Sequence, residues 1–131
     1  MRLFTYGTLT FPEVWQRISV GTFPSRTAVL KGYSLFRVKE AVYPGIIRSN
    51  SASEVHGLLL DGINDDTMFE LDAYESSFYD RLPVKVVVED GAEVECYAYI
   101  VPESRRDLLT NESWDKEWFR DNELHRYLSG A

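Results

Sequence analysis

The chain has 131 residues, of which 44% are hydrophobic and 14% aromatic, enough to build one substantial core and too apolar for a disordered chain. Its net charge is −7, and residues 1–60 contain seven Lys or Arg against three Asp or Glu, whereas residues 61–131 contain seven against eighteen. The acidic second half argues against nucleic acid and anionic membranes as partners, and we expect a single domain over residues 1–131.

Near its start the chain has the apolar pair Leu3-Phe4, followed directly by Thr5-Tyr6-Gly7-Thr8-Leu9. This order predicts a strand that ends in a tight loop. Glycine at position 7 permits a positive φ and a close approach of a ligand to the main chain. Consecutive free amides in such a turn form a concavity that suits a carboxylate or an oxyanion. Short glycine loops are also ordinary turns after edge strands, so the loop alone does not establish a site.

Next in the chain, Pro12 suits a helix start, and strands are predicted over residues 27–38, 41–48 and 54–61. Asn64 is a good N-cap for a helix over Asp65–Glu75. A hairpin over residues 82–89 and 93–101 follows, because Asp90-Gly91 between β-branched runs is a strong turn signal. A last amphipathic helix is predicted over residues 114–128, with Trp114, Trp118 and residues 124–128 facing inward.

These elements give about six strands with helices inserted between them. Hairpin and meander connections make most strand pairs antiparallel, and many short strands favour a closed or nearly closed barrel. The predicted fold class is therefore α+β, a small and mostly antiparallel β-barrel flanked by helices.

Glu75 is a charged residue on the apolar face of its predicted helix. Stepping about 100° per residue from Met68 places Leu71 at about 300° and Glu75 at about 340°, so the carboxylate lies on the apolar face. An unpaired buried carboxylate is costly, desolvation raises its pKa, and such local contradictions concentrate at functional sites. Two alternatives stay open: the helix frays before Glu75, or Arg81 or Arg37 pairs with it.

The remaining candidate groups suggest neither a metal nor a cofactor. Cys96, the single cysteine, lies in a predicted strand and has the character of a packed hydrophobic residue in a reducing compartment. His56 and His125 lie on different predicted elements, with no second nitrogen or sulfur ligand spaced near them. Without a basic segment leading into an apolar run, or an apolar run long enough for a membrane span, we expect a cytoplasmic protein.

Cations gather in the first half of the sequence and could attract a small anionic substrate, although a solvated surface is their commoner role. These cations are Arg2, Lys31, Arg37, Lys39 and Arg48.

Several short motifs, taken together, resemble one family. In chain order they are Tyr6-Gly7-Thr8-Leu9, Phe11-Pro12-Glu13-Val14, Tyr43-Pro44-Gly45, His56-Gly57-Leu58-Leu59, Leu71-Asp72-Ala73-Tyr74-Glu75 and Tyr79-Asp80-Arg81. Over roughly residues 3–101 this order is similar to the γ-glutamylcyclotransferase-like family, in particular its branch named after plant avirulence-induced proteins. The combination is far more specific than any one motif.

The resemblance implies a small β-barrel with peripheral helices, a substrate cavity at the barrel mouth, and a catalytic glutamate at Glu75. It also implies a set of substrate-binding residues, namely the loop of Tyr6, Gly7, Thr8 and Leu9 around the glutamyl moiety, Tyr79 in the pocket, and more weakly Tyr43 and Tyr99. Two features depart from the family: Ser76 follows Glu75 where glycine is frequent, and the stretch after Val101 carries no family signature.

The chemistry of this family needs few protein groups. In a γ-glutamyl amide the substrate's own α-amine attacks the γ-carbonyl and releases 5-oxoproline, so one carboxyl can serve as base and then as acid. We therefore expect a cofactor-free γ-glutamyl cyclotransferase, a monomer or weak homodimer, acting on a small γ-glutamyl amine or amino acid. A non-catalytic small-molecule binding domain and an amidohydrolase remain alternatives.

Overall fold

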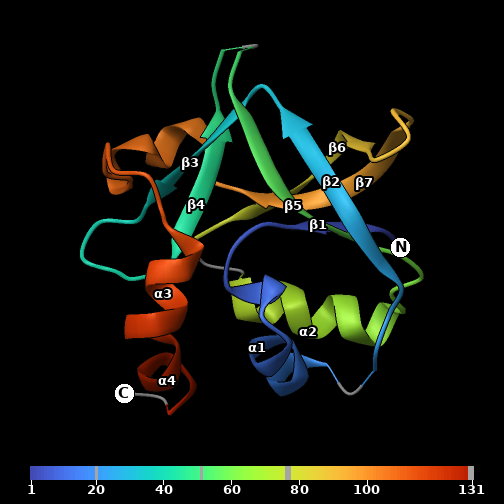
Figure 1. The fold of residues 1–131 in the computed structure, drawn as a ribbon, viewed down its shortest axis with the longest axis horizontal. Helices are drawn as coiled ribbons and strands as arrows, with labels where there is room; N and C mark the ends of the chain where they lie inside the picture. Colours follow the sequence, from blue (N-terminus) through green and yellow to red (C-terminus); the bar gives the residue numbers. More distant parts are fainter. Residues whose placement is uncertain (20, 51, 76–77, 130–131) are drawn as a thin grey trace.

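The structure is a computed structural model that describes residues 1–19, 21–50, 52–75 and 78–129. Within these ranges its strands are β1 (Leu3–Thr5), β2 (Ser25–Lys31), β3 (Tyr33–Arg37), β4 (Pro44–Arg48), β5 (Glu54–Leu60), β6 (Asp80–Val88) and β7 (Glu93–Ile100). Five of them close a barrel in the order β1-β5-β2-β6-β7, while β3 and β4 form a separate two-stranded sheet (Figure 1). Paired strands are antiparallel, except that β1 and β7 are parallel. The predicted α+β barrel is confirmed.

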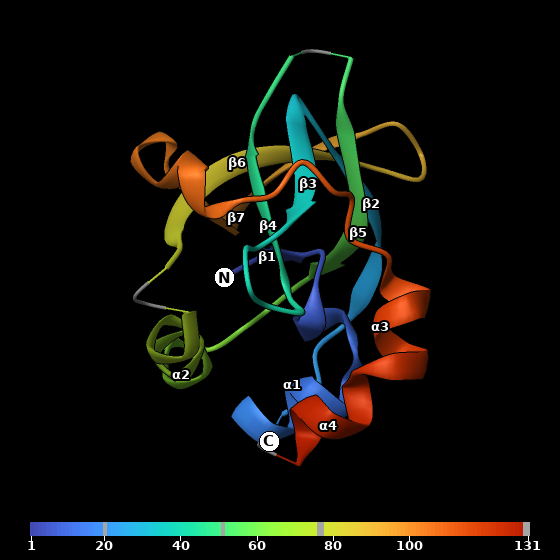
Figure 2. The same ribbon diagram turned by 90° about the vertical axis from the view of Figure 1, so that its left-hand side faces the viewer.

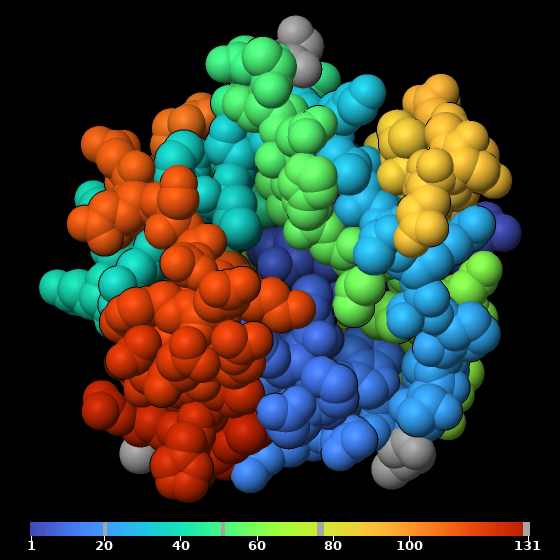
Figure 3. Space-filling view, in the orientation of Figure 1, coloured from blue at the N-terminus to red at the C-terminus, as the bar shows by residue number. Residues whose placement is uncertain are grey.

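Most of the helices lie at one end of this barrel. The helices of the described residues are α1 (Pro12–Ile18), α2 (Asp65–Glu75), α3 (Lys116–Asn122) and α4 (Leu124–Leu128), with two 3-10 helices, η1 (Thr8–Thr10) and η2 (Glu103–Leu108). Two perpendicular views show α1, α2 and α4 below the strands (Figure 1 and Figure 2). In the space-filling view the N-terminal segment, in dark blue, lies at the bottom of a hollow between the green strands and the orange C-terminal segment (Figure 3). No described helix is long and apolar enough to cross a membrane.

The hydrophobic core has two parts because successive side chains of a strand point to opposite faces. In β1, Leu3 packs against the helices, whereas Phe4 lies in the barrel core. In β7, Ala98 and Ile100 belong to the barrel core and Tyr99 to the helix side. These two adjoining strands therefore carry side chains to the boundary between barrel and helices, where the candidate site lies.

The local signals for several elements are confirmed. Pro12 is the first residue of α1, and the backbone N–H of Thr67 donates to Asn64 Oδ1 over 2.8 Å, so Asn64 caps α2. The hairpin turn between β6 and β7 contains Gly91 with φ of +88°. Because α2 has the predicted bounds, the helix continues through Glu75 and the alternative that it frays earlier is wrong.

The predicted strand over residues 27–38 is divided in the structure. Gly32 adopts φ of +86°, which turns the chain between β2 and β3. β2 stays in the barrel between β5 and β6, whereas β3 leaves it to pair with β4. A single glycine inside an apolar stretch was too weak a signal to predict this break.

The predicted helix over residues 114–128 is two short helices, α3 and α4. Trp114 is buried, as predicted, but the expectation for Trp118 is wrong, because 41% of its surface is exposed. Asp115 caps α3 by accepting hydrogen bonds from the first backbone N–H groups of the helix. With this start, Phe119 rather than Trp118 turns into the core, where it is fully buried.

Candidate active site

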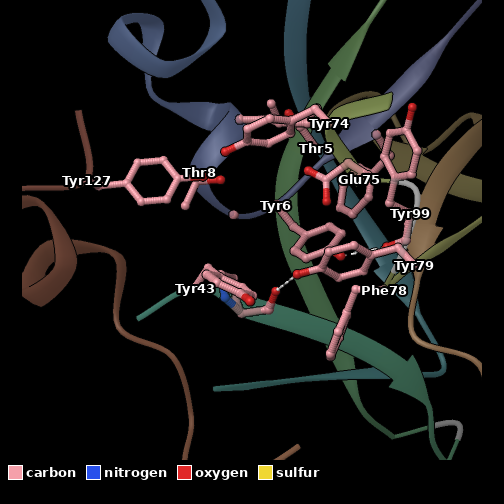
Figure 4. A pocket seen from close by; sticks show the side chains of 14 residues that line it. Thr5, Tyr6, Thr8, Tyr43, Tyr74, Glu75, Phe78, Tyr79, Tyr99 and Tyr127 are labelled. Carbon is pink, nitrogen blue, oxygen red and sulfur yellow. Dashed lines mark hydrogen bonds between the residues drawn. The ribbon is translucent and has the colours of Figure 1, made fainter. Parts of the chain in front are cut away.

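A cavity of about 220 Å³ lies between the end of β1, the end of α2, β7 and α4 (Figure 4). It is lined by Phe4, Thr5, Tyr6, Gly7, Thr8, Leu9, Tyr43, Pro44, Tyr74, Glu75, Phe78, Tyr79, Tyr99 and Tyr127. All the predicted site residues are among them, namely Tyr6, Gly7, Thr8, Leu9, Tyr43, Glu75 and Tyr79, and so is the weaker candidate Tyr99. The fold thus brings the sequence candidates together in one place, while their individual roles stay predictions.

Glu75 is the charged residue in this lining, and its environment is largely apolar. On the same helix, Met68 and Leu71 are buried in the core, so the final turn of α2 presents Glu75 beside apolar surface. Burial raises the pKa of the Glu75 carboxyl from 4.5 to about 7. The expected alternative partners lie elsewhere: Arg81 pairs with Asp72, and the Arg37 Nε donates to a main-chain carbonyl.

Two tyrosines beside Glu75 have their hydroxyl protons committed to the main chain. The Tyr6 hydroxyl donates to the carbonyl oxygen of Tyr99, and the Tyr79 hydroxyl donates to that of Pro44, each over 2.6 Å. Burial raises the pKa of both phenols, and the negative charge of Glu75 adds to the effect. Because each hydroxyl has one proton, these oxygens can offer further bonding partners only their lone pairs. Lone pairs beside a carboxylate suit a substrate group that donates, such as an ammonium or amide N–H.

The turn after β1 supplies main-chain groups to the cavity. η1 begins directly after Gly7, and the first N–H groups of such a turn have no partner within it. Gly7 has φ of −122°, so this position uses no left-handed backbone conformation. A Cβ at Gly7 would lie 2.8 Å from Pro44 Cγ, which shows that close packing requires glycine here.

The cations of the N-terminal half do not gather around this cavity, and none of the five lines it. Arg2 forms an exposed ion pair with Asp61, with Nε and Oδ1 3.3 Å apart. Lys31 and Arg48 line a different hollow on the barrel surface. The hypothesis that these cations attract an anionic substrate has no support at this site.

Metal-binding residues do not cluster in the part of the chain that the structure describes, where no group of three or more His, Cys, Asp or Glu could hold an ion. His56 lies 3.1 Å from Glu54 on the exposed surface. Cys96 is buried in the barrel core, which confirms its packing role, and burial raises its pKa to about 11. A thiol with so high a pKa is a poor nucleophile.

Comparison with known proteins identifies the family of the chain. The sequence profile of "Gamma-glutamyl cyclotransferase, AIG2-like" matches residues 3–116. The chain belongs to this family. It is 34% identical to AIG2-like protein C of Arabidopsis thaliana, over 98% of this chain and 74% of that protein, and 37% identical to AIG2-like protein A of the same plant, over 95% and 73%.

Solved structures agree with the fold of this AIG2-like chain. A solution structure from Arabidopsis thaliana superposes with a TM-score of 0.74 and 28% identity, covering 98% of this chain and 86% of that chain. A structure named gamma-glutamyl cyclotransferase superposes with a TM-score of 0.68 over 99% of this chain and 85% of that chain. Its identity is 18%, so it shows a shared fold alone.

Behind the cavity wall, the AIG2-like chain carries a second carboxylate with several partners. Asp72 accepts hydrogen bonds from Arg81 Nε and Nη2 over 2.8 and 3.1 Å, and from the Tyr99 hydroxyl over 2.8 Å. The Arg81 guanidinium also lies 4.8 Å from the centre of the Tyr97 ring. This network ties the last turns of α2 to β6 and β7, and thereby fixes the helix that carries Glu75.

Sequence reasoning missed several lining residues of the AIG2-like site, among them Tyr74, Phe78 and Tyr127. Tyr74 precedes the candidate glutamate, so its place in a family motif was the available signal. Tyr127 lies outside the matched residues 3–116, and only the apolar face of the last helix indicated that it points inward. Ser76, the departure noted after Glu75, lies outside the described residues.

Proposed function

We propose that the protein is a γ-glutamyl cyclotransferase that converts a small γ-glutamyl amine or amino acid into 5-oxoproline and a free amine. Glu75 is the general base and then the general acid. One observation carries this proposal: the Glu75 carboxyl lies in a cavity and has no ion-pair partner among the described residues, and its burial raises its pKa to about 7. A group that titrates near neutral pH can both accept and return a proton.

The first half of the reaction closes a ring. The Glu75 carboxylate accepts a proton from the substrate's α-ammonium, and the freed amine attacks the γ-carbonyl carbon. A new carbon–nitrogen bond forms and completes a five-membered ring, leaving negative charge on the former carbonyl oxygen. Because attacking and attacked atoms belong to one molecule, the main task of the protein is to hold the substrate folded.

In the second half the tetrahedral intermediate collapses. Protonated Glu75 gives its proton to the leaving nitrogen, the original amide bond breaks, and the carboxylate is restored. The ring nitrogen loses its second proton to the released amine, which departs as an ammonium ion. No nucleophile from the protein enters this sequence, which agrees with a cavity that contains one acid–base group and many tyrosines.

The other lining groups support binding and orientation. The lone pairs of Tyr6 and Tyr79, whose protons are held by main-chain carbonyls, can accept from the substrate ammonium beside Glu75. The N–H groups that begin η1 are available for the glutamyl carboxylate or for the oxyanion of the intermediate. Together they would place the α-amine and the γ-carbonyl within reach of Glu75.

The direct test incubates purified protein with a panel of γ-glutamyl amines and γ-glutamyl amino acids and identifies products by mass spectrometry. Release of 5-oxoproline with the free amine is the expected result. Release of glutamate instead would show that Glu75 activates water, as in an amidohydrolase. Binding of these compounds without turnover would identify a non-catalytic binding domain, and either outcome would overturn the proposal.

A further inference from the structure

Tyr127 comes from α4, a helix that lies beyond residues 3–116, yet it forms part of the cavity wall. Burial raises the pKa of its hydroxyl. Figure 4 shows Tyr127 next to Thr8, so the C-terminal helix and the loop that the family motif assigns to the substrate line the same cavity.

The ring of Tyr127 is held by aromatic packing. Its centre lies 5.7 Å from that of Phe119 at an interplanar angle of 70°, and Phe119 in turn packs against Phe11 and Trp114 with ring centres 5.5 Å apart in both pairs. Leu124, one turn before Tyr127, is buried in the same cluster. A ring anchored in this way offers a fixed surface to a ligand, with little loss of side-chain entropy on binding.

The cavity has two chemically different sides. Figure 4 shows Glu75 grouped with Tyr6, Tyr79 and Tyr99, whereas Tyr127 lies on the far side of Thr8. Cyclisation requires the α-amine and the γ-carbonyl at Glu75, so the group carried by the leaving nitrogen has to extend away from it. The side of the cavity away from Glu75 is therefore the space left for the group on the leaving nitrogen.

We propose that Tyr127, Tyr43 and Tyr74 form the subsite for the leaving amine, and that this subsite selects amines that carry a flat apolar group and lack a carboxylate. The inference rests on the proposed function. Aromatic faces pack favourably against apolar and aromatic groups. A leaving group with a carboxylate would lose its hydration with no cation to compensate, because Glu75 is the charged group among the described lining residues.

Three substrates separate these two preferences: γ-glutamylphenethylamide, γ-glutamylethylamide and γ-glutamylphenylalanine. The first and second differ by the phenyl ring, and the first and third differ by the carboxylate alone. We expect kcat/KM for the phenethylamide to exceed that for the ethylamide by about fivefold, from aromatic packing. Its advantage over γ-glutamylphenylalanine should be at least about tenfold, from the uncompensated charge.

Tyr127→Ala and Tyr127→Leu test which residue creates the preference for the ring. Both remove the aromatic face, and leucine keeps much of the bulk if alanine impairs folding. The phenethylamide-to-ethylamide ratio of kcat/KM should fall towards one in each variant, mainly through a higher KM for the phenethylamide, whereas Tyr127→Phe should retain the ratio. Tyr33→Ala, a tyrosine outside the cavity lining, is the control and should retain it as well.

An unchanged ratio in Tyr127→Leu, or a wild-type protein that prefers γ-glutamylphenylalanine, would overturn the subsite. If the wild-type protein converts none of the three compounds, the proposed function fails while the subsite can still be measured. Isothermal titration calorimetry of the same compounds then decides, since loss of the phenethylamide preference in Tyr127→Leu supports the subsite and an unchanged preference refutes it.

Discussion

Asp72 and Glu75 lie one turn apart on α2, yet the protein surrounds these two carboxylates in opposite ways. Asp72 accepts two hydrogen bonds from the Arg81 guanidinium and one from the Tyr99 hydroxyl. Glu75 lies in a cavity of aromatic side chains, no described residue forms an ion pair with it, and burial raises its pKa to about 7. The fold thus holds Asp72 in a network between α2, β6 and β7, and it leaves Glu75 without an ion-pair partner among the described residues.

Arg81 is the group that separates the two environments. Residues three apart on a helix are neighbours, so a long cationic side chain near α2 could have reached either carboxylate. The guanidinium is instead held by its two bonds to Asp72 and by the Tyr97 ring beneath it. This arrangement keeps the positive charge of Arg81 away from Glu75, where it would lower the pKa of the carboxyl.

The largest expected difference between the two carboxylates is in catalysis. Glu75→Gln keeps the shape of the side chain but removes proton transfer, so kcat/KM should fall at least about a hundredfold while substrate binding survives. The measurements are steady-state release of 5-oxoproline and calorimetric binding of a γ-glutamyl amide.

Asp72→Asn is the matched control, because it removes one negative charge from the same helix. It should lower kcat/KM by less than about tenfold, through a looser α2 alone. A Glu75→Gln variant with nearly wild-type turnover would exclude Glu75 as the acid–base group. An equal loss of kcat/KM in both variants would show that Glu75 and Asp72 do not differ in their roles.

The dependence of activity on pH sharpens the comparison. Because the pKa of Glu75 is about 7 in the folded protein, the base form is scarce below neutrality, and kcat/KM should rise about tenfold between pH 6 and pH 8. The profile of Asp72→Asn should keep this midpoint. A rising limb near pH 4.5, the ordinary value for glutamate, would contradict the assignment.

Stability should respond to Asp72 more than to an exposed acid. Asp72→Ala leaves the partly buried Arg81 guanidinium without its bidentate partner, and the free energy of unfolding should fall by about 2 kcal/mol. Asp61→Ala, which breaks the exposed pair with Arg2, is the control and should cost less than about 0.5 kcal/mol. Urea unfolding of both variants measures this difference, and equal losses would show that Asp72 is no structural tie.

The smallest effect is a gain in stability from Glu75→Gln. The pKa of Glu75 is about 7 when folded against an ordinary 4.5, so the folded state binds the proton more tightly and loses stability as pH rises from 4.5 to 7. Glutamine has no charge to desolvate, and the variant should be more stable than wild type by about 1 kcal/mol at pH 8, allowing for residual solvation.

Near pH 4.5 that advantage of Glu75→Gln should shrink, because wild-type Glu75 is then protonated in the folded state. Urea midpoints at the two pH values give the comparison. A variant less stable than wild type at pH 8 would mean that the Glu75 carboxylate is stabilised by its surroundings.

The position of Glu75, the helix that carries it and the barrel around the cavity could be predicted from the sequence. The helical spacing of Met68, Leu71 and Glu75 placed a carboxylate on an apolar face, and the Asn64 cap fixed the bounds of that helix. The order of motifs predicted the barrel and the set of residues that gather at the cavity. These features are local or repeat at a fixed period, so they can be read without knowing the tertiary contacts.

Other features depend on long-range packing and were not predictable. The sequence does not show whether Arg81 pairs with Glu75 or with Asp72, because the position of β6 decides between them. Gly7 suggested a left-handed turn, whereas its role is to admit the Pro44 ring from a segment far along the chain. Tyr127 reaches the cavity because the C-terminal helices fold back and pack against the start of the chain.

The pairing of β1 with β7 determines when the cavity is completed during folding. Leu3 lies opposite Tyr97 in this parallel pair, so the barrel closes only when the start of the chain meets a strand more than ninety residues later. Closing so long a loop is entropically unfavourable, which makes such contacts late events in folding. The Tyr6 hydroxyl reaches the Tyr99 carbonyl across the same seam. A chain still emerging from the ribosome, with β7 not yet released, therefore lacks the Tyr99 wall of the cavity, and the cavity is completed only in the closing step.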